Sequence, residues 1–450
     1  MSGMNPDVVV AGAGASGMCA ALAAARLGSH VLLLEKGSIP GGTNTQSLVG
    51  PLMGFHAGQK QVVRGLAQEI VDRLERRGGT LGHLPDPLGV TSTLTPIDPE
   101  ILKQVYFEML REEKNITLLL HTFVTGAHRE GKWLRSLRAV HKGGETDITA
   151  PVFIDATGDA DVAHLAGVPC VYGRPEDGFA QPMTLVIRAD RVDLDRVRRT
   201  MRLCPDQFVL RKDALDMPYV AVSGYFDKVR RAREKGTLTF PRDRVLFFQG
   251  VREGEVILNM SRVVRHRSTD AFDLTKAEME GRRQADEIMD FLREEIDGFQ
   301  QARLIQTGDA IGVRESRHIR GDYTLTEEDI LNQAVFDDSV AICAFPIDLH
   351  DPLGKELHWT KTDPASCFDV PYRVMLPENL GNLLVTGRCV SATHQAAASL
   401  RITPTAMALG QAAGTAASMA PAGNVRNLSL PALHRVLLEM DAVPGRSFLP

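Results

Sequence analysis

The sequence is constrained most by three glycines near its start. Gly12, Gly14 and Gly17 form a G-x-G-x-x-G motif, which follows the apolar run from Asp7 to Ala11 and precedes an alanine-rich segment that favours a helix. The first glycine permits a tight turn, the second lets the backbone approach a pyrophosphate, and the third lets helix and strand pack closely. The N–H groups of the helix start would face the phosphate charge. The motif therefore predicts a dinucleotide site, with a purely structural turn as the alternative.

The next segment supports the same prediction. The run from His30 to Leu34 is short and apolar, as a strand covered on both faces of a parallel sheet should be. Glu35 follows it and is placed to accept bonds from a ribose 2′-hydroxyl, which disfavours the 2′-phosphate of NADP. Strand, helix and acid in register favour the dinucleotide site over the structural turn.

The length of 450 residues predicts two or three domains. Residues 1–169 read as the first part of a nucleotide-binding domain. Residues 170–375 lack its alternation of strands and helices and are expected to form an inserted α+β domain, whose clearest helix has an apolar stripe between Ala285 and Ile296. Leu383 to Val385 is expected to rejoin the first sheet, so that residues 376–450 complete the first domain.

Composition excludes several classes of protein. The formal net charge of −5 gives no broad reason to expect binding to nucleic acid or to anionic lipid. No apolar run approaches the roughly 18 residues of a membrane span and no leader precedes the first strand, so we expect a cytoplasmic protein without membrane contact. The six cysteines form no C-x-x-C pair, and neither a metal site nor a redox dithiol is expected.

Five further segments carry a family resemblance. Gly41–Thr43, Ile154–Asp159 and Leu383–Arg388 resemble the remaining FAD contacts of glutathione-reductase-type flavoproteins. More narrowly, residues 312–323 and 399–414 resemble the FAD-dependent oxidoreductase family, which is related to the flavoproteins of fumarate reductase and succinate dehydrogenase. The resemblance covers nearly the whole chain. It implies an α/β fold in which a Rossmann-type FAD-binding domain carries an inserted α+β substrate domain.

The resemblance also implies which residues bind FAD. Many relatives carry an acid where this chain has Arg388, which leaves the role of that arginine open. The residues implied are Gly12, Gly14, Ala15, Ser16 and Gly17 at the pyrophosphate, Glu35 and Lys36 at the adenosine ribose, Gly42 and Thr43 on the ribityl side, Val124 at the adenine with Ala156, Thr157 and Gly158 in the same half, Gly387 and Arg388 by the ribityl and pyrophosphate, and Thr403, Pro404, Ala406 and Met407 at the flavin.

The helix expected from Thr403 has a chemical role in this scheme. Proline in its first turn costs nothing, because the missing N–H has no partner there. The positive end of the helix would point at flavin N1 and O2 and stabilise the negative charge of reduced flavin. An ordinary buried helix against the sheet is the alternative.

Four residues are candidates for the reacting side. Arg314 belongs to a cluster with Arg317 and Arg320. If this segment alternates as a strand does, one face of the cluster could meet the flavin. Its arginines would suit an anionic substrate or the FAD pyrophosphate, and a structural arginine–glutamate network is the alternative. Arg401 lies just before the flavin helix, His394 lies one short segment earlier, and His350 lies in the run Pro346–Pro352. A histidine near the ring could take a proton as hydride leaves for N5, although a lone loop histidine is more often a bystander.

Two further side chains are possible reactive groups. His56 lies in the glycine- and proline-rich segment that follows the second predicted strand, and some flavoproteins bind FAD covalently through such a histidine. Cys389 beside Arg388 has no partner cysteine, which favours a small buried residue over a reactive thiol.

The sequence leaves several functions open. The first is hydride transfer between FAD and a small organic substrate, with an unknown electron donor or acceptor; a homo-oligomer is compatible with it. The second is a monooxygenase or halogenase using NAD(P)H and O2, for which Gly308-Asp309 echoes a hydroxylase motif while the two tryptophans are too few for a halogenase. A non-catalytic FAD-binding protein and a colourless NAD dehydrogenase are the others.

Overall fold

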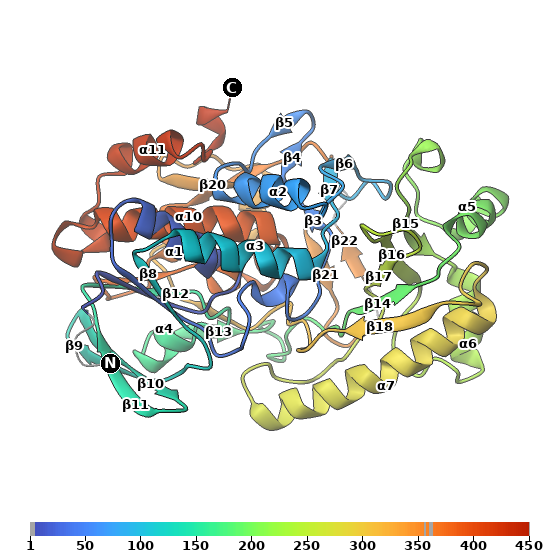
Figure 1. The fold of residues 1–450 in the computed structure, drawn as a ribbon, viewed down its shortest axis with the longest axis horizontal. Coiled ribbons are helices and arrows are strands. Elements are labelled where there is room, and N and C mark those ends of the chain that lie inside the picture. The colour runs from blue at the N-terminus through green and yellow to red at the C-terminus, as the bar shows by residue number, and fades with distance from the viewer. Residues whose placement is uncertain (1–4, 355–356, 360–362, 450) are drawn as a thin grey trace.

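The computed structural model describes residues 5–354, 357–359 and 363–449. Its organising element is a sheet of five parallel strands in the order β24-β12-β1-β2-β8 (Figure 1). The bounds are β1 Val8–Ala11, β2 Val31–Leu34, β8 Ile116–Leu119, β12 Val152–Asp155 and β24 Leu383–Val385. The predicted return of the chain to the first sheet after a long insertion is therefore observed.

Side-chain alternation explains how this sheet is covered on both faces. Val8 and Val10 of β1 belong to a core with the helices α1 (Ala15–Arg26), α3 (Pro99–Glu112) and α10 (Thr403–Met419). Val9 and Ala11 belong to a second layer with the antiparallel strands β9 (Phe123–Glu130), β10 (Trp133–His141) and β11 (Gly144–Thr149). Figure 1 shows the helices on one side of the sheet and these three strands on the other.

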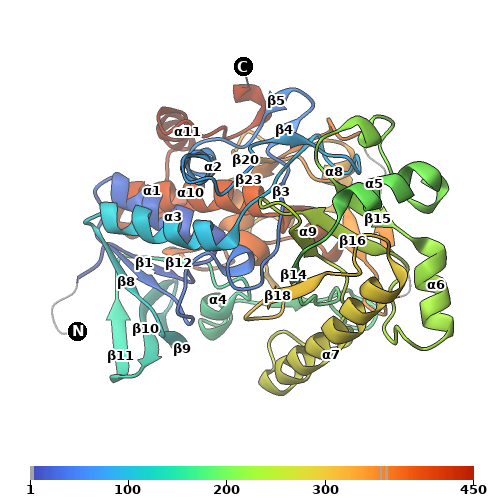
Figure 2. The same cartoon turned by 45° about the vertical axis from the view of Figure 1, so that its right-hand side comes forward.

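A second sheet forms the centre of the inserted domain. Its antiparallel strands run in the order β15-β16-β17-β14-β18, and α7 packs along it (Figure 2). One face carries the second core, which draws its residues from Met183 to Ile311. The bounds are β14 Ile187–Asp190, β15 Ala221–Gly224, β16 Val245–Gln249, β17 Val256–Leu258, β18 Arg303–Thr307, α5 Leu194–Leu203, α6 Phe226–Glu234 and α7 Ala271–Glu295.

The second core ends earlier in the chain than the inserted domain expected from sequence. Apolar residues of 340–347 and 367–376 pack into the core of the first domain instead, because β20 (Ser339–Cys343) lies against α10. A strand expected from Leu185 begins at Ile187. The extended run expected over residues 314–320 is reduced to β19 (Arg317–Ile319).

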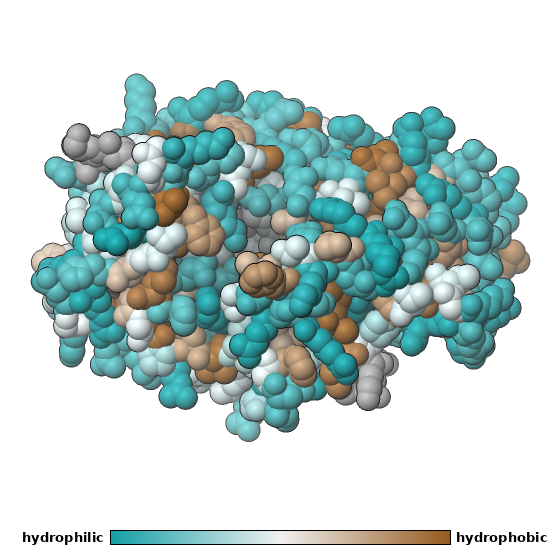
Figure 3. All heavy atoms as spheres, turned by 90° about the horizontal axis from the view of Figure 1, so that it is seen from below, coloured by the Kyte–Doolittle hydropathy of each residue, from teal (hydrophilic) through white to brown (hydrophobic). Residues whose placement is uncertain are grey.

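The remaining elements complete the first domain and its excursions. They are α2 Leu66–Arg76, α4 Asp161–Leu165, α8 Glu327–Leu331, α9 His394–Leu400, α11 Leu430–Glu439, β3 Leu52–Met53, β4 His56–Ala57, β5 Lys60–Gln61, β6 Leu84–Pro85, β7 Thr93–Thr95, β13 Cys170–Tyr172, β21 Asp348–His350, β22 Leu357–Trp359 and β23 Phe368–Pro371. None of the helices in the described ranges could span a bilayer. On the face seen in Figure 3 hydrophilic residues predominate and hydrophobic ones form small separate groups.

Candidate FAD and substrate site

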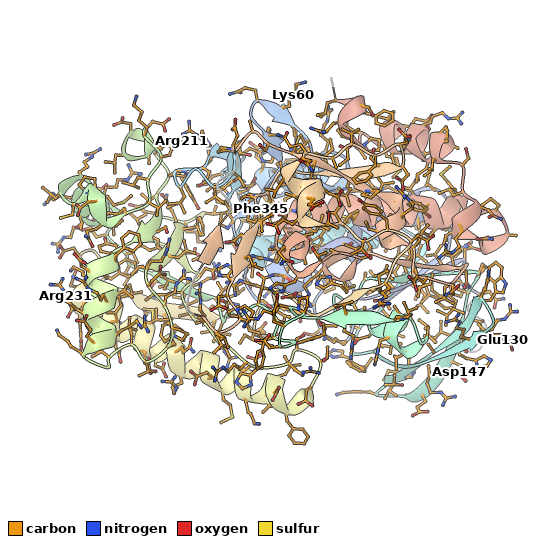
Figure 4. All side chains as sticks on the ribbon, turned by 180° about the vertical axis from the view of Figure 1, so that it is seen from behind. Lys60, Glu130, Asp147, Arg211, Arg231 and Phe345 are labelled. Carbon is orange, nitrogen blue, oxygen red and sulfur yellow. The ribbon has the colours of Figure 1, made fainter. Side chains whose placement is uncertain are left out.

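A single cavity of about 520 Å³ brings most of the predicted site together. It lies at the carboxyl ends of the parallel strands, where open α/β sheets bind their ligands, and the second sheet forms its opposite wall. Figure 4 places one lining residue, Phe345, in the middle of the molecule, whereas Arg211 and Arg231 lie at its periphery. The predicted FAD-binding residues that line it are Gly12, Gly14, Ala15, Ser16, Glu35, Lys36, Gly42, Thr43, Val124, Ala156, Thr157, Gly158, Gly387, Arg388, Thr403 and Ala406.

The glycine loop has the geometry that the motif predicts. Gly12 has a φ of +97°, and a Cβ there would lie 2.4 Å from the carbonyl oxygen of Ala156. Gly14 precedes α1 with no side chain capping the helix, and a Cβ there would meet nothing within 4 Å. Gly17 does not line the cavity; a Cβ on it would lie 1.8 Å from the carbonyl oxygen of Gly12, which is the packing role expected of the third glycine. The free N–H groups of α1 therefore face open space.

A second helix start faces the same cavity. Thr403 and Ala406 line it, whereas Pro404 and Met407 do not, and no side chain caps α10. Since α1 and α10 both begin at this cavity, their first turns offer two sets of unpaired N–H groups to one ligand. An extended dinucleotide needs anion-binding groups at its pyrophosphate and a positive dipole at its flavin, so the residues present fit FAD.

Close helix packing holds these two starts in place. A Cβ at Gly410 would lie 2.1 Å from the carbonyl oxygen of Ser16, and one at Gly414 would lie 2.0 Å from that of Ala20. The backbones of α1 and α10 therefore touch where α10 has no side chains. The G-x-x-x-G spacing of these glycines in the sequence was a signal for this contact that sequence reasoning missed.

Glu35 and Arg388 tie the loops of the site together. The carboxylate of Glu35 accepts the N–H of Ala13 at 2.8 Å and that of Gly37 at 2.7 Å, and each of its oxygens can accept a further bond. Arg388 donates to the carbonyl oxygens of Gly158 at 2.8 Å and Val313 at 2.5 Å. It also pairs with Asp159 at 2.9 Å, so this arginine joins the loops after β12 and β24 to the second sheet.

A charged triad occupies the far end of the cavity. The guanidinium of Arg401 contacts Asp348 at 2.9 Å, and the Nε2 of His350 lies 3.2 Å from the same carboxylate oxygen. Burial opposes ionisation of Asp348, but His350, Arg401 and Arg314 hold its pKa well below the usual range. Asp348 was not predicted from sequence, although it stands two residues before His350.

The hydrogen bonds of His350 define its tautomer. Its Nδ1 lies 2.9 Å from a guanidinium nitrogen of Arg262. Arginine can only donate, so Nδ1 accepts and Nε2 carries the proton that points to Asp348. Burial lowers the pKa of His350 to about 3, despite the opposing effect of Asp348, so the ring is neutral near pH 7.

Arg314 lies at the same end without an acidic partner. It donates to the carbonyl oxygen of Pro182, to the hydroxyl of Thr184 and, at 3.2 Å, to the side-chain oxygen of Asn259. Burial, reinforced by Arg401 and Arg262, lowers its pKa to about 9. Within the described part of the chain, no carboxylate oxygen lies within ion-pairing distance of Arg314.

Two more buried arginines share this environment. Arg242 lines the cavity and donates to the carbonyl oxygens of Arg244 and Asn259, both at 3.2 Å. Arg262 lies behind His350, and burial lowers the pKa of both arginines. Neither was predicted from sequence, because single arginines in a segment of mixed elements carry no local signal.

His394 lies elsewhere than predicted. It does not line the cavity, because its Nδ1 is 2.7 Å from the buried carboxylate of Glu315, which also accepts the backbone N–H of Gln181 at 2.8 Å. That network draws residue 315 inward and prevents the regular strand expected there. His394 is therefore a structural partner of Glu315. The partner of this glutamate is a histidine, whereas the structural alternative in the sequence was an arginine–glutamate network.

The other weighed side chains also lie away from the cavity. His56 contacts the hydroxyl of Thr93 at 2.9 Å and does not line it. Cys389 is fully buried, and burial raises the pKa of its thiol well above the usual value, as expected of an unreactive core residue.

Comparison with known families agrees with this cavity. The family model described as FAD dependent oxidoreductase matches residues 7–437. The chain belongs to the FAD-dependent oxidoreductase family. FAD is its cofactor, and the uncapped starts of α1 and α10 are the features that fit it. No curated protein matches the chain.

Solved structures of similar fold share little sequence with this family member. The p-nitrophenol 4-monooxygenase PnpA from Pseudomonas putida DLL-E4 is 12% identical, with a TM-score of 0.47 over 97% of this chain and 80% of that one. The flavin-dependent brominase Bmp2 is 12% identical, with a TM-score of 0.49 over 97% and 83%. A geranylgeranyl bacteriochlorophyll reductase-like protein from Thermoplasma acidophilum is 12% identical, with a TM-score of 0.45 over 97% and 83%. At this identity and score, the likeness carries no inference about activity.

Proposed function

We propose that this oxidoreductase transfers hydride between FAD and a small organic anion. Bound FAD supplies N5 as the atom that accepts or donates hydride. The observation that carries the proposal is a cluster of buried arginines at one end of the cavity. Arg242, Arg314 and Arg401 line the cavity and Arg262 lies behind His350; of these four, only Arg401 forms a salt bridge with a described carboxylate, that of Asp348. Unpaired buried charge is costly, and a bound anion would neutralise it.

Arginine chemistry favours a carboxylate as that anion. The planar guanidinium donates two parallel bonds to a carboxylate. The Nε–H of Arg401 is buried and has no hydrogen-bond partner among the described residues. The Nη2 of the same group donates to the carboxylate and to the backbone oxygen of Asp348, so a bound carboxylate would accept the remaining Nε–H and hold the substrate against the flavin-facing start of α10.

His350 is proposed to position Asp348 rather than to move a proton by itself. Its Nδ1 lone pair is taken by Arg262 and its Nε2–H points at Asp348. Arg314 and Arg401 are the groups left to bind substrate, and both guanidinium groups are largely buried, which strengthens each charged contact.

The monooxygenase alternative gains no support from the position of its motif. Gly308 and Asp309 follow β18 in the second sheet, where the N–H of Asp309 donates to the carbonyl oxygen of Gln46 at 2.7 Å. Asp309 does not line the cavity. Oxygen consumption coupled to NAD(P)H oxidation would nevertheless favour that function over ours.

The test is anaerobic bleaching of the purified yellow protein by a panel of small organic acids and their neutral amides or alcohols. We expect only acids to bleach the flavin band. Arg314→Gln should slow bleaching by about 100-fold, the scale of losing one buried charge contact, whereas Arg303→Gln, at an exposed pair with Asp190, should not. A protein bleached equally by neutral analogues, or by none of the panel, would contradict the proposal.

A further inference from the structure

The cavity extends beyond the charged end along one strand of the second sheet. Side chains two residues apart in a strand share a face. Accordingly Arg244, Leu246 and Phe248 line the cavity, whereas Val245 and Phe247 belong to the core on the opposite face. Polarity therefore changes from charged to apolar along β16. The distance from residue 244 to residue 248 is about 14 Å at the rise of an extended strand.

The charged end of this strand continues the arginine cluster. Ser223 lies directly opposite Leu246 in the antiparallel pair β15–β16 and also lines the cavity. The side chain of Asn259, which binds Arg314, follows β17. Arg244 is paired with Asp243 and adds no net charge, so the unpaired positive charge belongs to Arg242 and Arg314.

The apolar end is built by three separate segments. Leu88 and Val90, from the segment before β7, and Val209 line the cavity, and the first two pack in one apolar cluster with Leu246 and Phe248. Leu246, Val90 and Val209 are only half-buried although they lie inside a cavity. Apolar side chains that stay accessible inside a concave site gain free energy when an apolar ligand covers them.

We propose that the substrate is an amphipathic organic acid, with its carboxylate at Arg314 and the neighbouring Arg401 and Arg242 and an apolar body along Leu246 and Phe248. This rests on the proposed function and narrows its substrate class. A compact di- or tricarboxylate would satisfy the arginines and leave the wall of Leu88, Val90 and Val209 exposed. A neutral hydrocarbon would cover that wall and leave the arginines unpaired.

Binding to the oxidised holoenzyme tests this without turnover. Straight-chain alkanoates from butanoate to decanoate are titrated, and the shift of the flavin absorption band and of the melting temperature are followed. Each added methylene should tighten binding about fourfold, which corresponds to burial of one methylene, and the matching alcohols should bind at least tenfold more weakly. Equal affinity for butanoate and decanoate, or tighter binding of short dicarboxylates, would overturn the proposal.

A pair of variants in the second sheet localises the effect. Leu246→Asn should abolish the chain-length dependence while the flavin content stays that of the wild type. Ile305→Asn, at an exposed apolar position of β18 outside the cavity, is the matched control and should retain the dependence. Retention of the dependence by Leu246→Asn would overturn the proposal. A holoenzyme that binds decanoate through Leu246 but is bleached by no acid would support this inference and contradict hydride transfer.

Discussion

At the scale of single residues, the charge at the substrate end of the cavity depends on the protonation states of its side chains. Asp348 remains ionised because two arginines face it, and His350 remains neutral because it is buried between Arg262 and Asp348. The site therefore presents fixed positive charge to a ligand near pH 7. A histidine in solution would instead be partly protonated there.

The neutrality of His350 has a consequence for stability. Its pKa is lowered from 6.5 to about 3 on folding, so its contribution is fully present above pH 6.5 and is lost as the pH falls from 6.5 toward 3. Between pH 7 and pH 5 the histidine becomes protonated in the unfolded chain but not in the folded protein, which lowers the free energy of unfolding by about 2 kcal/mol. His350→Gln should therefore lose about 2 kcal/mol less unfolding free energy than the wild type over this interval.

Urea unfolding at pH 7 and pH 5 measures this difference. His128→Gln, at an exposed position of β9, is the control and should follow the wild type. If His350→Gln loses as much stability as the wild type between the two pH values, the ring is not neutral in the folded protein.

At the scale of elements, the helix pair α1–α10 sets the geometry of the cofactor site. Contact through Gly410 and Gly414 brings two helix starts to one cavity. A methyl group at either glycine would collide with a backbone carbonyl of α1, and backbone cannot rotate away as a side chain can. The spacing between the two N-termini therefore depends on these two residues.

Gly410→Ala tests that dependence. We expect it to cost about 1–3 kcal/mol of unfolding free energy, the range for overpacking, and to lower the FAD content of the purified protein because α1 and α10 move apart. Gly281→Ala in α7 is the matched helical control, since its nearest neighbours would be side-chain atoms and not backbone, those of Leu185 at 3.0 Å and Ile311 at 3.5 Å. Equal stability and FAD content in both variants would show that α1 and α10 tolerate a wider separation.

Elements of the first domain could be predicted from the sequence more closely than those of the inserted domain. The strand over Leu383–Val385 has the bounds expected, because both of its faces are buried and a glycine turn follows. The strand alternation expected from Arg314 onward is limited to β19 (Arg317–Ile319), because the side chain of Glu315 turns inward to His394. That contact joins residues 79 positions apart, and no local pattern signals it.

The candidate site likewise contains residues that local motifs predict and residues that only the tertiary fold brings together. Sixteen predicted FAD-binding residues line the cavity because their motifs are local and specify their own turns. Arg242 and Arg262 could not be predicted, because they meet only after β16 pairs with β17. Asp348 and Leu246 likewise acquire a role only when the second sheet faces the first.

At the scale of the whole molecule, the cavity lies between the first domain and the second sheet. The first domain supplies the starts of α1 and α10, and the opposite wall includes Thr184 and Val186, just before β14, and Leu246 of β16. A ligand held by the first domain and covered by this wall stabilises their joint arrangement, because it binds the folded chain and not the unfolded one. FAD should therefore act as a structural component as well as a redox cofactor.

Gly14→Glu separates these two roles. Gly14 has a φ of −63° and a ψ of 177°, which any residue adopts without strain, and its Cβ would meet nothing within 4 Å. A carboxylate there faces the positive end of α1 and fills the space of the pyrophosphate. The variant apoprotein should melt at or slightly above the wild-type temperature, yet gain nothing from FAD. Wild-type apoprotein should gain about 2.7 kcal/mol when FAD is present at 100 times its Kd. Lys132→Gln, which also makes the net charge more negative by one unit but at an exposed position, should gain as much as the wild type. Thermal melts with and without FAD measure these differences. Stabilisation of Gly14→Glu by FAD would mean that the start of α1 does not hold the pyrophosphate. Unfolding of the Gly14→Glu apoprotein would mean that the open space at Gly14 is needed for the fold itself.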